Sequence, residues 1–421
     1  MSVMVRVLRR SGAAPKMPPA FARLWGAATV SALGDGAYAA ALPLFAVALS
    51  KDPVVISLVS VAMVLPHLVV GLVAGALVDR WDRRRTMWVA DLWQALLLAL
   101  AVVAGAVGAL GIPALLALAF LLGVGELFFD VASQAYLPDL LGRDQTLLRR
   151  ANGRLRGAST AAGQFAGPPV GSFLFSLART MPFLVDAVSF VASALLIRTL
   201  PPAPVPERVE GRGVWADARE GFGYVVRDRL LLGLALRPAV GNLAFGAVGA
   251  VLVLFAQDTL GLSAVGYGFL LAADAVGGLL GAMVVAGPLE KLLGTGTALT
   301  LTAVVEGASI LVFGLAGNPW LAGAMFALCG CAMATTMVLG WSLRQAIVPG
   351  RLMGRVAAAS RLVALSAGPL GALLGGWLAS AAGLRTPYFA AAAVLLTMTV
   401  VTMSMTSNAK VKAALESRVD G

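Results

Sequence analysis

The chain has 421 residues, of which 59% are hydrophobic and only 13% carry a charge. Soluble domains carry charge on about a quarter of their residues, so this composition excludes an ordinary water-soluble fold and indicates an all-α integral membrane protein. The net charge of +11 does not indicate a nucleic-acid partner, because the basic residues gather in short segments between apolar runs. Such segments stay on the cytoplasmic side of a membrane and meet its anionic lipids.

Apolar runs long enough to cross a hydrocarbon core of about 30 Å recur along the whole chain. They predict twelve transmembrane helices, at residues 21–48, 54–78, 87–107, 112–137, 152–178, 181–200, 231–257, 264–288, 296–315, 319–343, 357–382 and 386–406.

The positions of the 32 Lys and Arg residues predict the orientation of these helices. With the amino terminus inside, the outer loops hold only Lys51, Arg179 and Arg385. Because short basic loops stay cytoplasmic, we expect both termini in the cytoplasm and a multi-pass protein of the cell membrane, in contact with the lipid bilayer.

The longest polar stretch divides the predicted helices into two groups of six. It starts with prolines, and from residue 214 to 226 it is typical of an amphipathic helix on the membrane surface. The expected organisation is a cytoplasmic segment 1–20, a six-helix bundle 21–200, a linker 201–230, a second six-helix bundle 231–406 and a cytoplasmic tail 407–421.

A Gly-Pro pair occurs at equivalent places in the two halves. Gly167 and Pro168 lie in "QFAGPPVGSFLF", and Gly368 and Pro369 lie in "SAGPLGALLGGWL". Small residues let two membrane helices approach closely, and proline kinks a helix. A parallel duplication predicts two bundles that are related by a pseudo-twofold axis and rock around a site at the membrane midplane.

Five acidic residues fall near the middle of predicted membrane helices. A carboxylate at the bilayer centre costs about 2.5 to 3.5 kcal/mol, and the only basic residues within the predicted membrane interior are His67 and Arg237. Some of the acids must therefore be protonated, lie in a solvated cavity or pair with a cationic substrate. The five acids are Asp35, Glu126, Asp186, Asp274 and Glu306.

Catalytic and metal-binding patterns are not found in the sequence. Cys329 and Cys331 have no second Cys pair and no histidine nearby, so they predict reduced thiols packed among helices rather than a metal site. No phosphate-binding loop is present, and His67 is the only histidine. We therefore expect neither an enzyme nor a cofactor.

The segment "GALVDRWDRRR" at 75–85 resembles the signature loop that the major facilitator superfamily places between its second and third helices. Asp82 stands where the signature has Gly. The matching residues are Gly75, Leu77, Asp79, Arg80, Arg83 and Arg84.

The segment "GQFAGPPVGS" resembles the antiporter signature of the fifth helix. Ser172 replaces its last glycine, and Arg154 stands where the longer pattern begins with glycine. With "LRQAIVPGRLMGRV" and "GPLGALLGGWLA", the chain resembles the drug-exporter branch that includes macrolide efflux and enterobactin exporter proteins. The matching residues are Gly163, Gly167, Pro168 and Gly171.

The resemblance implies a cavity lined mainly by helices one, four, seven and ten, with two, five, eight and eleven at its sides. Asp35 and Glu126 are then the first candidates for proton coupling, and Asp274 is the third. His67 is either a proton relay or a packing residue. The two peripheral acids, Asp186 and Glu306, are expected to make hydrogen bonds between packed helices.

An inner latch is a second implication of the resemblance. Asp79 is expected to face the start of the eleventh helix, whose free amide groups attract an anion. Arg83 is expected to reach Asp130, with Asp91 close by. The alternative is a charge cluster that only fixes topology.

Two functions remain open on the sequence alone. The first is a monomeric secondary exporter that trades a proton for a small, mostly apolar molecule. The alternative is an importer or facilitator of a nutrient, which would need more polar groups in the cavity. The candidate cavity helices offer few such groups, namely Asn242, Gln257, Trp341 and Gln345.

Overall fold

A computed structural model describes residues 17–78, 80–142, 144–202 and 222–416, and this part of the chain is helical and contains no strand. Nine helices of this part are long and apolar enough to cross a membrane, so the all-α multi-pass prediction is confirmed at that level. The first half comprises α2 (Pro19–Leu49), α3 (Pro53–Val69), α4 (Gly71–Val78), α5 (Arg83–Ala106), α6 (Ile112–Leu140), α7 (Gln145–Ala158), η1 (Ser159–Ala166), α8 (Gly167–Leu177) and α9 (Met181–Arg198). The second half comprises α11 (Arg229–Leu254), η2 (Phe255–Thr259), α12 (Ala264–Leu280), η3 (Gly281–Val285), α13 (Ala286–Leu293), α14 (Thr295–Leu315), α15 (Pro319–Ile347), α16 (Gly350–Ala382), α17 (Thr386–Met403) and α18 (Asn408–Glu416).

Polar residues in the short connections determine where the helices begin. The carboxylates of Asp52, Asp82, Asp144 and Asp228 each accept a hydrogen bond from a backbone N–H in the first turn of α3, α5, α7 and α11. These bonds satisfy donors that have no partner inside the helix. The predicted second helix is divided at Val70 into α3 and α4, and most of the predicted surface helix over 214–226 lies outside the described residues.

The fifth predicted helix is continuous but changes its winding in the middle. Pro168 and Pro169 have no N–H, so the carbonyls of Gln164 and Phe165 lose their partners four residues along. The turns before the prolines widen into the π-helical segment η1, which continues into α8. Such π segments are frequent at functional sites.

Glycines bring the Gly-Pro helix of each half against the first helix of its half. A Cβ at Gly167 would lie 2.6 Å from the Cα of Gly36 on α2. In the second half, a Cβ at Gly375 of α16 would lie 2.6 Å from the Cα of Ala247 on α11. No side chain larger than hydrogen fits these contacts, so the backbones touch.

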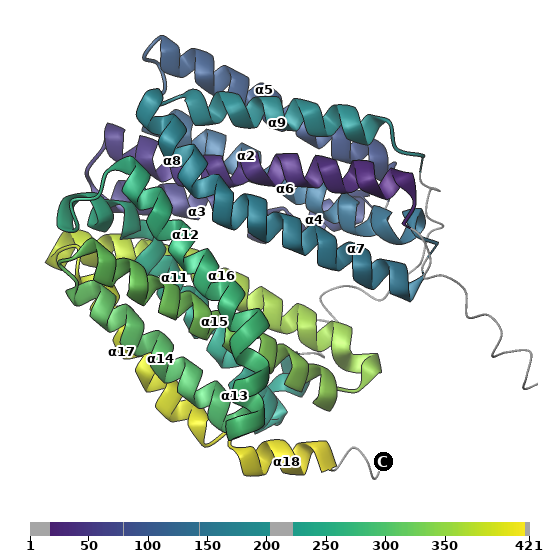
Figure 1. Ribbon diagram of the computed structural model, residues 1–421, viewed down its shortest axis with the longest axis vertical. Helices are drawn as coiled ribbons and strands as arrows, with labels where there is room; N and C mark the ends of the chain where they lie inside the picture. Colours follow the sequence, from purple (N-terminus) through teal and green to yellow (C-terminus); the bar gives the residue numbers. More distant parts are fainter. Residues whose placement is uncertain (1–16, 79, 143, 203–221, 417–421) are drawn as a thin grey trace, which may run out of the picture.

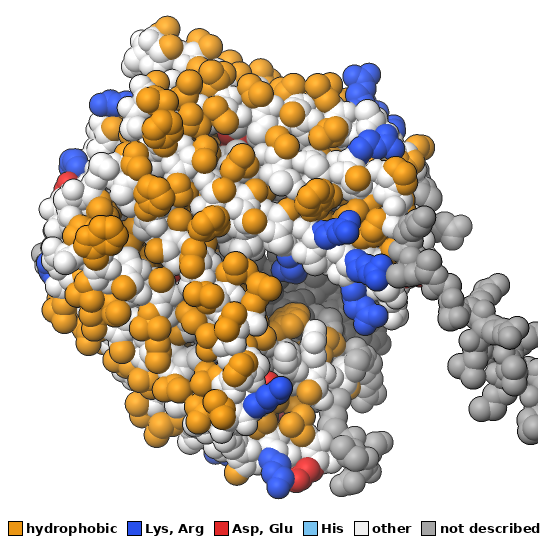
Figure 2. Space-filling model, in the orientation of Figure 1, with side chains coloured by type: hydrophobic (Ala, Val, Ile, Leu, Met, Phe, Trp, Pro, Cys, Tyr) orange, Lys and Arg blue, Asp and Glu red, His pale blue; other side chains and the backbone are white. Residues whose placement is uncertain are grey.

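The two groups of helices meet at one end and part at the other (Figure 1). At the closed end, Lys51 Nζ lies 3.0 Å from Asp258 Oδ1, and Gly376 of α16 packs against Pro53 and Ser57 of α3. At the opposite end the surface is hollowed between the two groups (Figure 2). The molecule is therefore closed on one side and open on the other.

Candidate functional site

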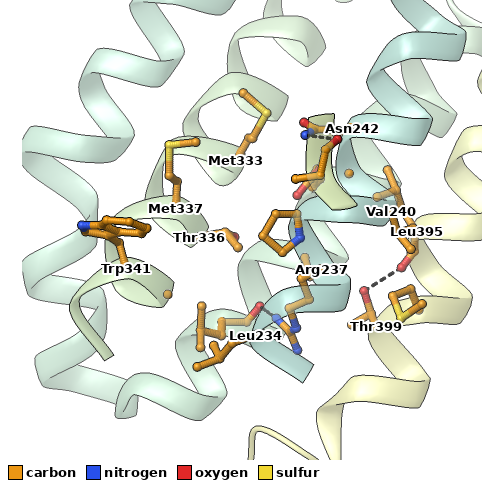
Figure 3. Close-up of a pocket in the computed structure, with 18 of the residues that line it drawn as sticks. Leu234, Arg237, Val240, Asn242, Met333, Thr336, Met337, Trp341, Leu395 and Thr399 are labelled. Atoms are coloured by element: carbon orange, nitrogen blue, oxygen red, sulfur yellow. Dashed lines mark hydrogen bonds between the residues drawn. The ribbon is translucent and has the colours of Figure 1, made fainter. Parts of the chain in front are cut away.

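A large cavity lies within the second group of helices. It has a volume of about 670 Å³ and is bordered by α11, α14, α15, α16 and α17. Figure 3 shows Met333, Met337 and Trp341 along α15, opposite Val240 and Leu395. The walls are mostly apolar, and the methionines can adapt to differently shaped molecules.

Arg237 lies in the cavity wall, but its guanidinium hydrogen bonds serve the protein. Arg237 is 8% exposed, and its Nε donates to Thr402 Oγ1 at 3.0 Å. Its other nitrogens donate to the carbonyl of Leu299 and to the hydroxyl of Thr406 at 3.2 Å. The arginine thus joins α11 to α14, α17 and the turn after α17.

Two other polar groups of the wall, from α11 and α15, also make contacts within the protein. Asn242 Nδ2 donates to the carbonyl of Ala364 at 2.9 Å. Thr336 Oγ1 donates to Thr302 Oγ1 at 2.7 Å. Of the four polar groups noted on the candidate cavity helices, Asn242 and Trp341 border this cavity, whereas Gln257 and Gln345 do not.

Glu306 also borders this cavity, which differs from the expected role in peripheral packing. Glu306 is 6% exposed. Gly241 of α11 lies opposite, and a Cβ at Gly241 would be 3.9 Å from Glu306 Oε1. The difference arises because α14 lies beside α15 and α17 and contributes its Glu306 face to the cavity wall. Because α14 is apolar on every side, its sequence does not indicate which side faces the cavity.

A second, smaller cavity lies in the first group of helices. It has a volume of about 110 Å³, and carboxyl groups from three helices border it: Asp35 of α2, Glu126 of α6 and Asp186 of α9. The structure therefore brings the two first candidates for proton coupling together. It adds Asp186, for which the sequence predicted a packing role.

Asp274 and His67 lie apart from both cavities. Asp274 of α12 rests on α15 at Gly330, where a Cβ would be 2.6 Å from Asp274 Oδ1. That oxygen is buried and has no hydrogen-bond partner in the described part of the chain. His67 is half-buried on α3 after Pro66, which packs against Gly123 of α6.

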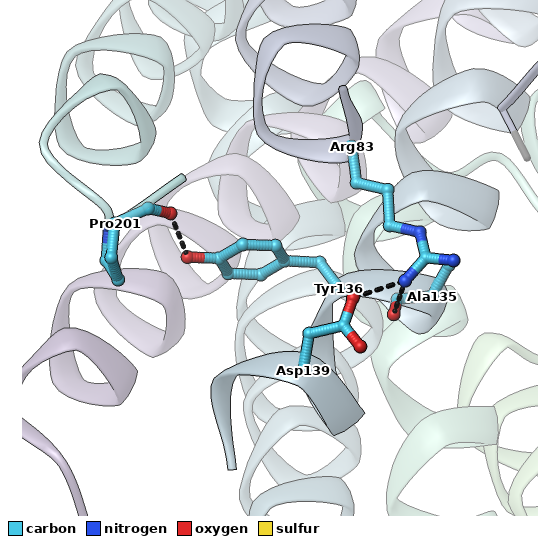
Figure 4. Close-up of polar contacts among 5 residues, drawn as sticks. All are labelled: Arg83, Ala135, Tyr136, Asp139 and Pro201. Carbon is cyan, nitrogen blue, oxygen red and sulfur yellow. Dashed lines mark hydrogen bonds and ion pairs between the residues drawn. The ribbon is translucent and has the colours of Figure 1, made fainter. Parts of the chain in front are cut away.

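The signature loop makes a different contact from the one expected. Arg83 forms an ion pair with Asp139 and donates to the carbonyl of Ala135, near the end of α6 (Figure 4). Arg83 was expected to reach Asp130 instead. Arg83 lies in the first turn of α5, level with the last turns of α6 that carry Asp139. Asp130 lies about 13 Å from Asp139 along α6, at a rise of 1.5 Å per residue.

Other contacts hold the same end of the first group together. Tyr136 donates its hydroxyl hydrogen to the carbonyl of Pro201 at 2.8 Å (Figure 4), and Arg84 donates to the carbonyl of Leu200 at 2.7 Å. Asp91 is fully buried on α5 beside Ser193 of α9, about 12 Å along the helix from Arg83. Asp79 lies outside the described residues.

Comparison with known proteins places this architecture in a family. The profile of the transmembrane secretion effector family matches residues 10–419. The multidrug efflux pump Tap of Mycolicibacterium fortuitum is 30% identical over 395 residues, which cover 92% of this chain and 95% of Tap. The enterobactin exporter EntS of Escherichia coli O1:K1 is 26% identical over 359 residues, covering 81% of this chain and 80% of EntS.

Solved transporters share the fold. A mutant of the nucleoside transporter NupG superposes with a TM-score of 0.75 at 13% identity, covering 92% of this chain and 100% of that one. A bacterial homologue of the iron transporter ferroportin, in an inward-facing state, also gives 0.75, at 17% identity and with 93% and 100% covered. The fold is that of a multi-pass membrane transporter. The chain belongs to the transmembrane secretion effector family of the major facilitator superfamily.

Proposed function

We propose that this protein is a secondary active exporter that exchanges protons for small, largely apolar molecules by alternating access. The observation that carries the proposal is the 670 Å³ cavity with mostly apolar walls, in a molecule whose surface is hollowed at one end (Figure 2). The efflux and export functions named for Tap and EntS support the direction.

The membrane arrangement in this proposal has twelve crossings in two bundles, residues 21–200 and 231–406. Nine of these crossings are the helices that meet the length and apolarity of a membrane span. The other three are formed by α3 together with α4, by α7 together with η1 and α8, and by α16. Both termini are cytoplasmic, so the hollow opens to the cytoplasm and the Lys51–Asp258 pair lies outside. Reporter fusions at the two ends of the chain test this orientation, and an external location of either end would contradict it.

Substrate binds in the large cavity, and protons bind at Asp35 and Glu126 in the other group of helices. Asp274 and His67 are kept as reserve candidates for the proton site. Since the two cavities share no bordering residue among those the structure describes, substrate and proton do not compete for one carboxylate. Coupling then passes through helix movement.

The test is export of ethidium, tetracycline and erythromycin from cells with and without the protein. We expect faster loss of at least one compound, abolished by a protonophore. Accumulation driven by the protein would favour the importer alternative, and no change for any of the three would contradict the proposal.

The proton site is tested with Asp35→Asn, Glu126→Gln and the double variant in proteoliposomes. An amide cannot exchange the proton, so uphill transport should fall at least tenfold in the double variant while downhill flux persists. If the double variant still couples a pH gradient to accumulation, the proton site must be sought at Asp274 and His67.

A further inference from the structure

Asp186 rests directly on the backbone of α2. The residue is 1% exposed, and Ser189 Oγ lies 3.0 Å from its Oδ1. The contact point on α2 is Gly34, where a Cβ would lie 3.0 Å from the Cβ of Ser189 and would overlap the Asp186 carboxylate. Gly34 precedes Asp35, and both Asp35 and Asp186 border the 110 Å³ cavity, so the two carboxyl groups lie on the same cavity between α2 and α9.

The three acidic residues around the 110 Å³ cavity differ in their exposure. Glu126 is exposed and Asp35 is half-buried, whereas Asp186 is almost completely buried. The three carboxyl groups therefore form a series of increasing burial from Glu126 to Asp186, and among the described residues no Lys or Arg borders the cavity.

Tyr38 provides an independent sign that a polar ligand belongs in this cavity. Tyr38 borders it and is 8% exposed, and its hydroxyl has no hydrogen-bond partner in the described part of the chain. A buried hydroxyl without a partner costs free energy unless water or another polar species fills the space.

The groups that face Asp186 in the described part of the chain are all acidic or neutral. From α2 they are Asp35 and Tyr38, from α5 Asp91, and from α6 Glu126. The remaining neighbour, α8, has no titratable side chain. Two ionised carboxylates at this depth would repel each other without a compensating cation, which favours a state in which the pair holds one proton between them.

We propose that Asp35 and Asp186 together form the binding site of the transported proton, with Glu126 as its exit to the hollow. This inference rests on the proposed exporter function and adds a residue to its proton site. In the form described here, the proton moves from the pair to Glu126 and then to water in the hollow. The pair is reloaded from the other side when the hollow closes.

The position of Asp35 suggests how binding of a proton there could change the packing of the helices. Gly34 contacts α9, and on the other side of Asp35 a Cβ at Gly36 would lie 3.0 Å from the Cα of Gly163 on η1. The same crossing continues into α8, whose Ser172 meets Gly268 of α12, where a Cβ would be 2.6 Å from Ser172 Oγ. Asp35 therefore lies where α2 is packed between α9 and the crossing formed by η1 and α8, which contacts the second half. A change of charge at Asp35 would affect the packing at this place.

The test uses purified full-length protein in proteoliposomes with a pH dye inside, with ethidium, tetracycline and erythromycin each as probe. The variants are Asp186→Asn, Asp35→Asn and, as a matched acid-to-amide control remote from the cavity, Glu290→Gln. We expect probe-driven proton movement to fall at least tenfold in both Asp variants, while downhill probe flux stays within about twofold of wild type. Glu290→Gln should behave as wild type.

Ser189→Ala keeps both carboxyl groups and decides the question if Asp186→Asn does not yield folded protein. Loss of the hydroxyl removes a donor that favours ionised Asp186, so the pH profile of coupled transport should move to higher pH. A purely structural role of Asp186 predicts no such shift.

The failures of the two proposals are distinguishable. If the wild type moves none of the probes, the exporter function is wrong, and this inference with it. If the wild type couples a probe to proton movement and Asp186→Asn does so equally, or if Ser189→Ala leaves the pH profile unchanged, this inference alone is wrong.

Discussion

Arg237 shows how a single buried charge can join several helices. Its guanidinium donates to groups of α14, of α17 and of the turn that follows α17, and no carboxylate accepts a hydrogen bond from it among the described residues. Hydrogen bonds that involve a charged group contribute about 1.5 to 3 kcal/mol each. Arg237 is therefore expected to stabilise the wall of the large cavity more than to bind substrate.

Arg237→Leu should lower the free energy of unfolding by about 3 kcal/mol, because the threonine hydroxyls and the Leu299 carbonyl lose a shared donor. Thermal unfolding in detergent measures the effect. The matched control is Arg229→Leu, since Arg229 is exposed and should change stability by less than about 0.5 kcal/mol. Equal melting temperatures for both variants would contradict the role given to Arg237.

At the scale of elements, the fifth crossing owes its place to glycine rather than to large side chains. Gly163, Gly167 and Gly171 all face α2, and a Cβ at Gly171 would lie 2.5 Å from the Cα of Ala37. The contact is close because the backbone replaces side chains at the interface. A helix held in this way can slide or rotate without unlocking interdigitated side chains, which suits a moving part.

Gly167→Val should abolish transport, because the branched side chain forces α8 away from α2 at a cost of about 1 to 3 kcal/mol. Gly157→Val is the matched control on the same crossing, since no atom of the described residues lies within 4 Å of a Cβ there. Transport of ethidium, tetracycline and erythromycin by proteoliposomes compares the two variants. Normal transport by folded Gly167→Val would mean that this glycine is incidental.

At the scale of the whole molecule, the Lys51–Asp258 pair joins the two groups of helices at the closed end. Both side chains are largely exposed, 59% and 44%, so the ion pair contributes at most about 1 kcal/mol. In the proposed alternating-access cycle it marks the place where the groups separate, and it is weak enough to open in each cycle.

Lys51→Cys with Asp258→Cys, in a background with Cys329→Ser and Cys331→Ser, should be arrested by a bifunctional thiol reagent. Cross-linking keeps the closed end shut, so transport should stop while each single-cysteine variant, treated alike, remains active. Flux through proteoliposomes before and after the reagent is the measurement. Undiminished transport by fully cross-linked protein would contradict opening at this end.

The sequence by itself was enough to show that this is a membrane protein and to which class of membrane protein it belongs. Apolar runs of membrane-spanning length, basic loops and two signature segments are local properties of the chain, and they do not depend on how the helices pack. The closeness of Asp35 to Glu126 was also anticipated, because the resemblance assigned both residues to helices that face one cavity.

Only the tertiary structure decided which side of each helix faces a cavity. Membrane helices such as α9 and α14 are apolar all round, so no amphipathic pattern reveals their rotation. Asp186 and Glu306 therefore looked like packing residues, although each borders a cavity. The choice of Asp139 over Asp130 by Arg83 likewise depends on how far α5 and α6 are offset along their axes, which is set by packing between helices and not by the spacing of residues within one.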